Sequence, residues 1–177
     1  METDLPAAQF EEFVRSRTPA LMRTAFLLTG DQHLAEDLVQ SALARTHRAW
    51  RRIREEQNAE AYTRKIMYHL RVSWWRRKRV KEQHADVMPE APVSGGDSTE
   101  DSVRRIAVWE AMMRLTPRQR AVLVLRFYED RSVTDTAELL GCSEGAIKSQ
   151  TSKALNLLRT KVPELRELRF FAEGSVA

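Results

Sequence analysis

Residues 84–101, near the middle of the chain, lack the helical periodicity that is present on both sides of them. Two prolines, Pro89 and Pro92, and the pair Gly95-Gly96 interrupt any regular element there. Proline removes a backbone donor and glycine adds conformational freedom, so this stretch is typical of a flexible linker. The sequence therefore predicts two small domains, residues 1–83 and 102–162, with a tail over residues 163–177.

Apolar residues recur at helical spacing on both sides of this linker, and no strand-like alternation persists. In the first half, Pro19 is expected to start a new helix or kink the first one, and Asp31 to cap the second. The side of the third helix that we expect to be buried carries Tyr62, Ile66, Leu70 and Trp74. In the second half, helices are expected over residues 102–115 and 117–128. The predicted fold class is all-α: two small helical domains joined by a flexible linker, the second containing a helix-turn-helix.

Residues 136–153 have the spacing of that helix-turn-helix. Ser132 resembles the start of a capping box, Gly141 ends the short helix, and Ser143 caps the longer one. The outward side chains of the longer helix are small, polar and basic, which suits a major groove. We expect DNA contacts from Ser143, Lys148, Ser149, Gln150, Ser152 and Lys153. A plain helical hairpin is the alternative.

Charge is distributed unevenly along the chain. Residues 45–81 contain thirteen Lys and Arg against three acids, whereas residues 85–101 contain five acids and no base. A basic block of this density indicates a polyanion partner, because each neutralised phosphate releases counterions. A solvated basic helix face is the other interpretation.

Within the basic block, rings alternate with guanidinium groups at spacings of four, three and four: Arg64, Tyr68, Arg71 and Trp75. This pattern suits unstacked single-stranded bases, since a base stacks on an aromatic ring while its phosphate meets an arginine. The alternative is packing against the protein's own core.

Several classes of protein are disfavoured. The single cysteine, Cys142, and the dispersed histidines offer no metal site, and we predict no cofactor. No Gly-rich phosphate loop or grouping of a nucleophile with a base indicates an enzyme, so no catalytic residue is expected. No stretch approaches the roughly 20 apolar residues of a membrane span, and one free cysteine is typical of the reducing cytoplasm, where we expect the protein to act without membrane insertion.

The order of these motifs resembles extracytoplasmic-function sigma factors of bacterial RNA polymerase, in their sigma-E-like branch. Three segments carry the resemblance: Ala35-Glu36-Asp37-Leu38-Val39-Gln40, residues 58–80 ending Trp74-Trp75-Arg76-Arg77-Lys78-Arg79, and Leu115-Thr-Pro-Arg-Gln-Arg-Ala-Val-Leu through Ser149. It covers nearly the whole chain apart from the linker and both tails. The sequence departs from the family's usual residues at Ser41, His69 and Gln150, which bears on promoter preference.

The resemblance implies roles for particular residues. Asp37 and Gln40 would contact the polymerase clamp, and the loop from Arg51 to Asn58 would hold a base flipped from the non-template strand. Asn58 could equally be only an N-cap. Residues implied in minus-ten recognition and melting are Asn58, Tyr62, Arg64, Tyr68, His69, Arg71, Trp75, Arg76 and Arg77, while the helix-turn-helix would read the minus-thirty-five element.

The implied partners are core RNA polymerase, through its clamp coiled coil and its flap, together with promoter DNA. The split into two domains motivates a further hypothesis, that an anti-sigma protein clamps both of them. The implied function is promoter recognition, melting and initiation, in a stress or cell-envelope response. An alternative is a conventional helix-turn-helix regulator that binds duplex DNA without acting as a polymerase subunit. It would explain residues 116–160 equally well, but not the Trp-Trp-Arg-Arg region.

Overall fold

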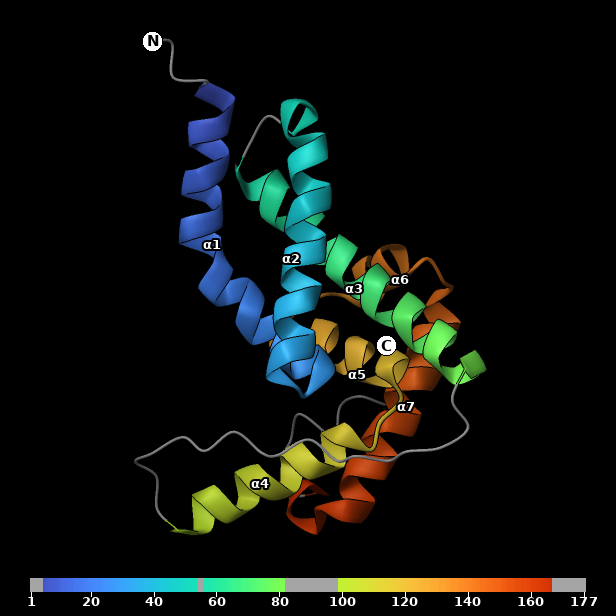
Figure 1. Ribbon diagram of the computed structural model, residues 1–177. Helices are drawn as coiled ribbons and strands as arrows, with labels where there is room; N and C mark the ends of the chain where they lie inside the picture. The colour runs from blue at the N-terminus through green and yellow to red at the C-terminus, as the bar shows by residue number, and fades with distance from the viewer. Residues whose placement is uncertain (1–4, 54–55, 82–98, 167–177) are drawn as a thin grey trace. The chain divides into compact units, whose positions relative to one another are not determined.

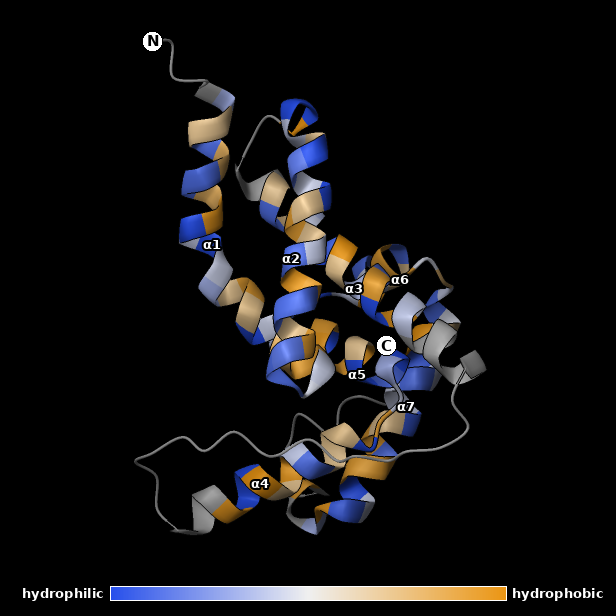
Figure 2. Ribbon diagram, in the orientation of Figure 1, coloured by the Kyte–Doolittle hydropathy of each residue, from blue (hydrophilic) through white to orange (hydrophobic). Residues whose placement is uncertain are grey.

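The computed structural model describes residues 5–53, 56–81 and 99–166. The chain divides into two compact units, residues 1–83 and residues 84–177. In the described residues every regular element is helical, which confirms the all-α prediction. Figure 2 shows hydrophobic and hydrophilic residues alternating along the helices, as amphipathic packing requires.

The amino-terminal unit contains α1 (Leu5–Thr29), α2 (Gln32–Ala49), the short 3-10 helix η1 (Trp50–Arg52) and α3 (Glu56–Lys81). Helix α2 packs against both α1 and α3 (Figure 1). The largest fully buried side chains include Phe13, Leu28, Leu38 and Met67, contributed by all three helices. All three helices therefore contribute to the core of this unit.

Helix α1 continues through Pro19 and changes direction partway along its length (Figure 1). Proline lacks a backbone N–H and crowds the preceding turn, so a bend is its usual effect inside a helix. Just before it, the Thr18 hydroxyl donates to the Val14 carbonyl at 2.6 Å. Of the two outcomes expected at Pro19, the kink is the correct one.

Helix α2 begins as predicted, because the Asp31 carboxylate accepts from the Leu34 N–H at 2.8 Å.

Helix α3 begins at Glu56, so Asn58 lies inside it and the N-cap alternative is wrong. The predicted buried stripe of α3 is also displaced. Tyr62 is exposed and Ile66 and Trp74 are only half-buried, whereas Leu70 is buried as expected. Among the described side chains of α3, the other buried residues are Ala59, Thr63, Met67 and Tyr68.

The carboxy-terminal unit contains α4 (Thr99–Met113), α5 (Pro117–Leu123), the π-helix η2 (Val124–Tyr128), α6 (Val133–Leu140), α7 (Glu144–Lys161) and the 3-10 helix η3 (Pro163–Arg166). Thr116 caps α5 in a capping box with Gln119, and Pro117 is the first helical residue, as expected. The second half of the helix predicted over 117–128 is π-helical rather than α-helical. One core joins α4, α5, α7 and η3.

Helical structure in this unit extends beyond the predicted limits at both ends. Helix α4 begins at Thr99, three residues before the expected start at 102. Its residues Val103 and Ile106 are exposed, whereas Trp109 is buried. At the other end, Leu165 on η3 is 4% exposed and belongs to the core, so this part of the expected tail is packed.

Gly141→Ala is expected to destabilise the carboxy-terminal unit by about 1 kcal/mol, because Gly141 has φ 62° and side chains disfavour this left-handed conformation. Gly145→Ala is the matched control, since Gly145 lies in the first turn of α7 and has no positive φ. Chemical denaturation, monitored through hydrogen exchange of peptides from this unit, measures the free energy of unfolding of both variants. Equal destabilisation by the two variants would contradict the prediction.

Candidate nucleic-acid interface

Helix α7 carries the predicted recognition face. Ile147, Thr151, Ala154 and Leu158 are buried as expected, which fixes the opposite face toward solvent. The residues predicted to contact duplex DNA are exposed at Ser143, Lys148, Ser149, Ser152 and Lys153, and half-buried at Gln150. A surface of short polar side chains flanked by lysines can approach phosphates and base edges closely.

The turn before α7 is tightly specified. Ser132 and Asp135 form the predicted capping box, and Ser143 accepts from the Ala146 N–H at 3.2 Å. The Cys142 N–H donates to the Ala137 carbonyl at 3.0 Å across Gly141, in the hydrogen bonding of a Schellman motif. The Thr134 hydroxyl also donates to Glu144 at 2.8 Å, which ties α6 to the start of α7. These local bonds set the angle between the two helices.

Sequence reasoning missed Arg120, which is 4% exposed. Its guanidinium donates to the carbonyls of Met112, Met113 and Leu115 at 3.1, 3.0 and 3.2 Å. The carbonyls of Met112 and Met113 lie at the end of α4, where helices leave acceptors unpaired, and Leu115 lies two residues beyond it. Arg120 therefore joins α4 to the helices that support the recognition helix. A basic residue three positions after the first helical proline gives no sequence signal for this role.

The face of α3 that was expected to bind single-stranded DNA instead packs largely within the protein. The Tyr68 side chain is fully buried, so its predicted exposure to bases is wrong. Arg71 donates through Nε to the Leu28 carbonyl at 3.1 Å, and burial lowers the pKa of its guanidinium. The core-packing alternative explains these side chains.

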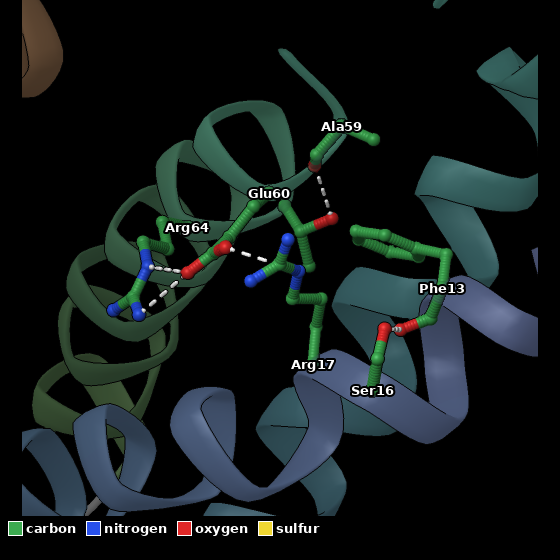
Figure 3. A network of polar contacts seen from close by, with 7 residues as sticks. Phe13, Ser16, Arg17, Ala59, Glu60 and Arg64 are labelled. Carbon is green, nitrogen blue, oxygen red and sulfur yellow. Dashed lines mark hydrogen bonds and ion pairs between the residues drawn. The ribbon is translucent and has the colours of Figure 1, made fainter. Parts of the chain in front are cut away.

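Arg64 belongs to a network between α1 and α3 that centres on Glu60 (Figure 3). Glu60 lies between two arginines, at 2.9 Å from Arg64 Nη2 and 3.4 Å from Arg17 Nε. Arg64 Nη1 also donates to the Thr24 hydroxyl at 2.6 Å. The side chains of Glu60 and Arg64 are 23% and 17% exposed, so their interaction is less screened than a surface ion pair. The network ties α3 to α1.

Another face of α3 is exposed, along Tyr62, Lys65 and His69 at spacings of three and four. Two rings flank a lysine, which is the aromatic and cationic combination that single strands favour. Lys65 was not singled out from the sequence. The side chains of the predicted contacts Asn58, Trp75, Arg76 and Arg77 lie outside the described part of the structure.

Partial burial of the ring, and secondarily the charge of Lys65, lower the pKa of His69 below 6.5. The neutral ring therefore predominates near pH 7 and offers one donor and one acceptor to a base. Because the unfolded chain binds this proton more readily, the contribution of His69 to stability is complete above pH 6.5 and is lost as the pH falls through its folded pKa.

Lys65→Gln is expected to move the pKa of His69 upward, because it removes the positive charge that disfavours the imidazolium. An NMR titration of the His69 ring protons measures this shift directly. Lys148→Gln, in the other unit, is the control and should leave the titration unchanged. A pKa for His69 that does not respond to Lys65→Gln would contradict the electrostatic contribution.

The residues expected to contact the polymerase clamp lie on α2. Asp37 and Gln40 are both exposed, whereas Leu38 and Val39 between them are buried. This placement is compatible with a protein contact and with simple solvation. Within residues 5–53, 56–81 and 99–166, no helix is both long and apolar enough to cross a membrane, and no group of three potential ligands could hold a metal ion.

Together, a capped helix-turn-helix in one unit and a helix with an exposed basic and aromatic face in the other define a helical protein that binds DNA. Residues 13–80 match the family Sigma-70 region 2, and residues 105–158 match Sigma-70, region 4. The chain belongs to the RNA polymerase sigma factors of the extracytoplasmic-function type.

Known proteins resemble this chain over most of its length. It is 42% identical to an RNA polymerase sigma-E factor of Streptomyces antibioticus over 160 residues, covering 90% of this chain and 87% of the relative. A second sigma-E factor, from Streptomyces coelicolor, is 40% identical over 154 residues, with 87% and 86% covered. The sigma factor RpoE from Bartonella quintana, solved in complex with the anti-sigma factor NepR, has a similar fold, with a TM-score of 0.68, 24% identity, and 88% and 97% covered.

Proposed function

We infer that this chain acts as a sigma subunit of RNA polymerase: it binds the core enzyme and directs promoter recognition, promoter melting and transcription initiation. The inference rests chiefly on the match of both Sigma-70 regions, in order, together with relatives at about 40% identity that share nearly the full length. The chain then supplies no catalytic residue of its own, and it acts in the cytoplasm with the polymerase.

The two units have different proposed tasks. Helix α7 reads the minus-thirty-five element in duplex DNA through Ser143, Lys148, Ser149, Gln150, Ser152 and Lys153. Helix α3 binds the separated non-template strand of the minus-ten element, with Tyr62, Lys65 and His69 as its exposed contacts. We assign Arg64, Tyr68 and Arg71 to the support of α3, because their side chains pack or bond within the unit. Asn58, Trp75, Arg76 and Arg77 stay predicted contacts.

The proposed protein partners are core RNA polymerase and an anti-sigma protein. Asp37 and Gln40 on α2 would contact the clamp coiled coil, and the carboxy-terminal unit would contact the flap. The anti-sigma partner is proposed because the similar Bartonella quintana protein was solved with one. A response to stress or to cell-envelope damage is compatible with such control.

Run-off transcription tests the inference. Core polymerase is supplied with a library of genomic promoter fragments, with and without this protein. Protein-dependent transcripts that share two spaced sequence elements would support a sigma factor and reveal its promoter code. If no such transcripts formed, and the isolated protein bound duplex DNA tightly, a conventional helix-turn-helix regulator would be the better description.

A further inference from the structure

The first turns of α4 expose apolar side chains that have no assigned role above. Residues 103–106 are all exposed, and Val103 and Ile106 are 61% and 45% exposed. With the half-buried Ala107 they lie on one face of the helix, because residues three and four positions apart are neighbours on a helix surface. Single exposed apolar residues are ordinary, whereas adjacent ones form a surface that favours a covering partner. We call these three residues the α4 face.

The α4 face is continuous with the core of its unit. Val103, Ala107 and Ala111 follow one another at a spacing of four. Ala111 is buried in the core cluster, and Ala107 packs against that cluster. Leu165, on η3, belongs to the same cluster, and in Figure 1 the red η3 lies beside α4. The chain therefore leaves η3 close to the row of side chains that leads to Val103.

The sequence after η3 contains apolar residues that could cover this face. Leu168, Phe170 and Phe171 all follow within five positions of Arg166, the last residue of η3. Five extended residues span about 17 Å. The eight helical positions from Ala111 back to Val103 span only about 12 Å. The aromatic pair can therefore reach the α4 face without any change in η3.

Charge and area favour this segment over a second copy of the chain as the occupant. Arg104 and Arg105 are exposed beside the α4 face. Glu167 and Glu173 flank the aromatic pair in sequence, so docking would bring carboxylates toward guanidinium groups. Two α4 faces packed together would instead bring the arginines of both copies close to one another, which is repulsive. Three side chains also fall far short of the roughly 800 Å² per partner of a stable interface.

We propose that residues 167–177 dock on the α4 face, with Phe170 and Phe171 covering Val103 and Ile106. This inference goes beyond the proposed function and does not depend on it. Docking would stabilise the start of α4, because a short helix depends on tertiary packing of its apolar face. It would also shield an apolar surface from unrelated proteins. A protein partner that binds the α4 face would have to displace the 167–177 segment first.

Methyl NMR of the full chain tests the proposal. A nitroxide is attached at Ser175→Cys in a Cys142→Ser background, and a diamagnetic label serves as the reference. We expect strong broadening of the Val103 and Ile106 methyl signals. Phe170→Ser with Phe171→Ser should remove this broadening and raise hydrogen exchange in the first turns of α4 about five- to tenfold.

Val176→Ser is the matched control, since it removes an apolar side chain of the same segment outside the aromatic pair. It should leave the broadening and the exchange unchanged. No broadening, or broadening that survives the phenylalanine substitutions, would overturn the proposal. Spin-labelled chains are also mixed with isotope-labelled chains that carry no nitroxide. Equal broadening in that mixture would show that the segment docks on a second copy, which would overturn docking within one chain.

Discussion

Glu60→Ala is expected to lower the free energy of unfolding of the amino-terminal unit by about 2 kcal/mol. Glu60 is the shared acceptor of Arg17 and Arg64, and its removal leaves two cations facing each other in a partly buried position. The cost should fall below that of a fully buried pair, because the Arg17 side chain is 38% exposed. A loss of this size corresponds to a decrease in melting temperature of roughly 10 °C for a domain of this length.

Native-state hydrogen exchange measures the effect within each unit separately, using peptides from α1 and α3 for the first unit and from α7 for the second. Glu12→Ala is the matched control, because the Glu12 to Arg15 ion pair spans 3.3 Å but its side chains are 57% and 74% exposed. It should change stability by less than about 0.5 kcal/mol. Equal losses in the two variants would show that the Glu60 network contributes no more than a surface pair.

The same substitution separates support of α3 from direct DNA contact. If the network only holds α3 on α1, lowering the temperature should restore promoter melting by Glu60→Ala holoenzyme, and a template with the minus-ten region already unpaired should be transcribed almost normally. Persistent failure on the unpaired template at low temperature would indicate that Glu60 or Arg64 acts on the DNA itself.

Elements whose signals are local could be predicted from the sequence. Asp31, Ser132 and Ser143 each cap a helix through a side chain that accepts from a backbone N–H three residues ahead. Gly141 adopts the left-handed conformation that ends α6. Such interactions involve only neighbouring residues, so residue type and spacing are sufficient to predict them. The face of α7 was also predictable, because its buried residues are apolar or small at regular spacing.

The orientation of α3 was not predictable in the same way. Arginines usually face solvent, and the pattern at Arg64, Tyr68 and Arg71 therefore indicated a surface. Their burial depends on partners that are distant in sequence: Arg64 bonds to Thr24, and Arg71 to the Leu28 carbonyl. On a helix with apolar and cationic residues on two faces, periodicity identifies the faces but not which of them contacts the neighbouring helix. Arg120 was missed for a similar reason, because the pattern of α5 does not show that its guanidinium bonds to backbone carbonyls at and just after the end of α4.

Lys148→Ala with Lys153→Ala is expected to reduce initiation from a promoter with both elements by about 10- to 100-fold. Both lysines are exposed on α7, opposite the buried Ile147, Thr151 and Ala154. Each substitution removes a contact to a base edge or a phosphate. Every 1.4 kcal/mol of lost binding free energy corresponds to about a tenfold weaker affinity. The core of the unit is untouched, so folding should be preserved.

Transcription from paired promoters, with and without the upstream element, measures this effect, together with the affinity of each variant for core polymerase. Lys161→Ala is the control, because Lys161 is also exposed but lies in the last turn of α7, more than three turns from Lys148. With the double variant, the upstream element should no longer increase transcription, and binding to the core enzyme should be normal. Equal loss of core binding would mean that this face of α7 contacts polymerase rather than DNA, since a base-reading surface is required only after the holoenzyme has formed.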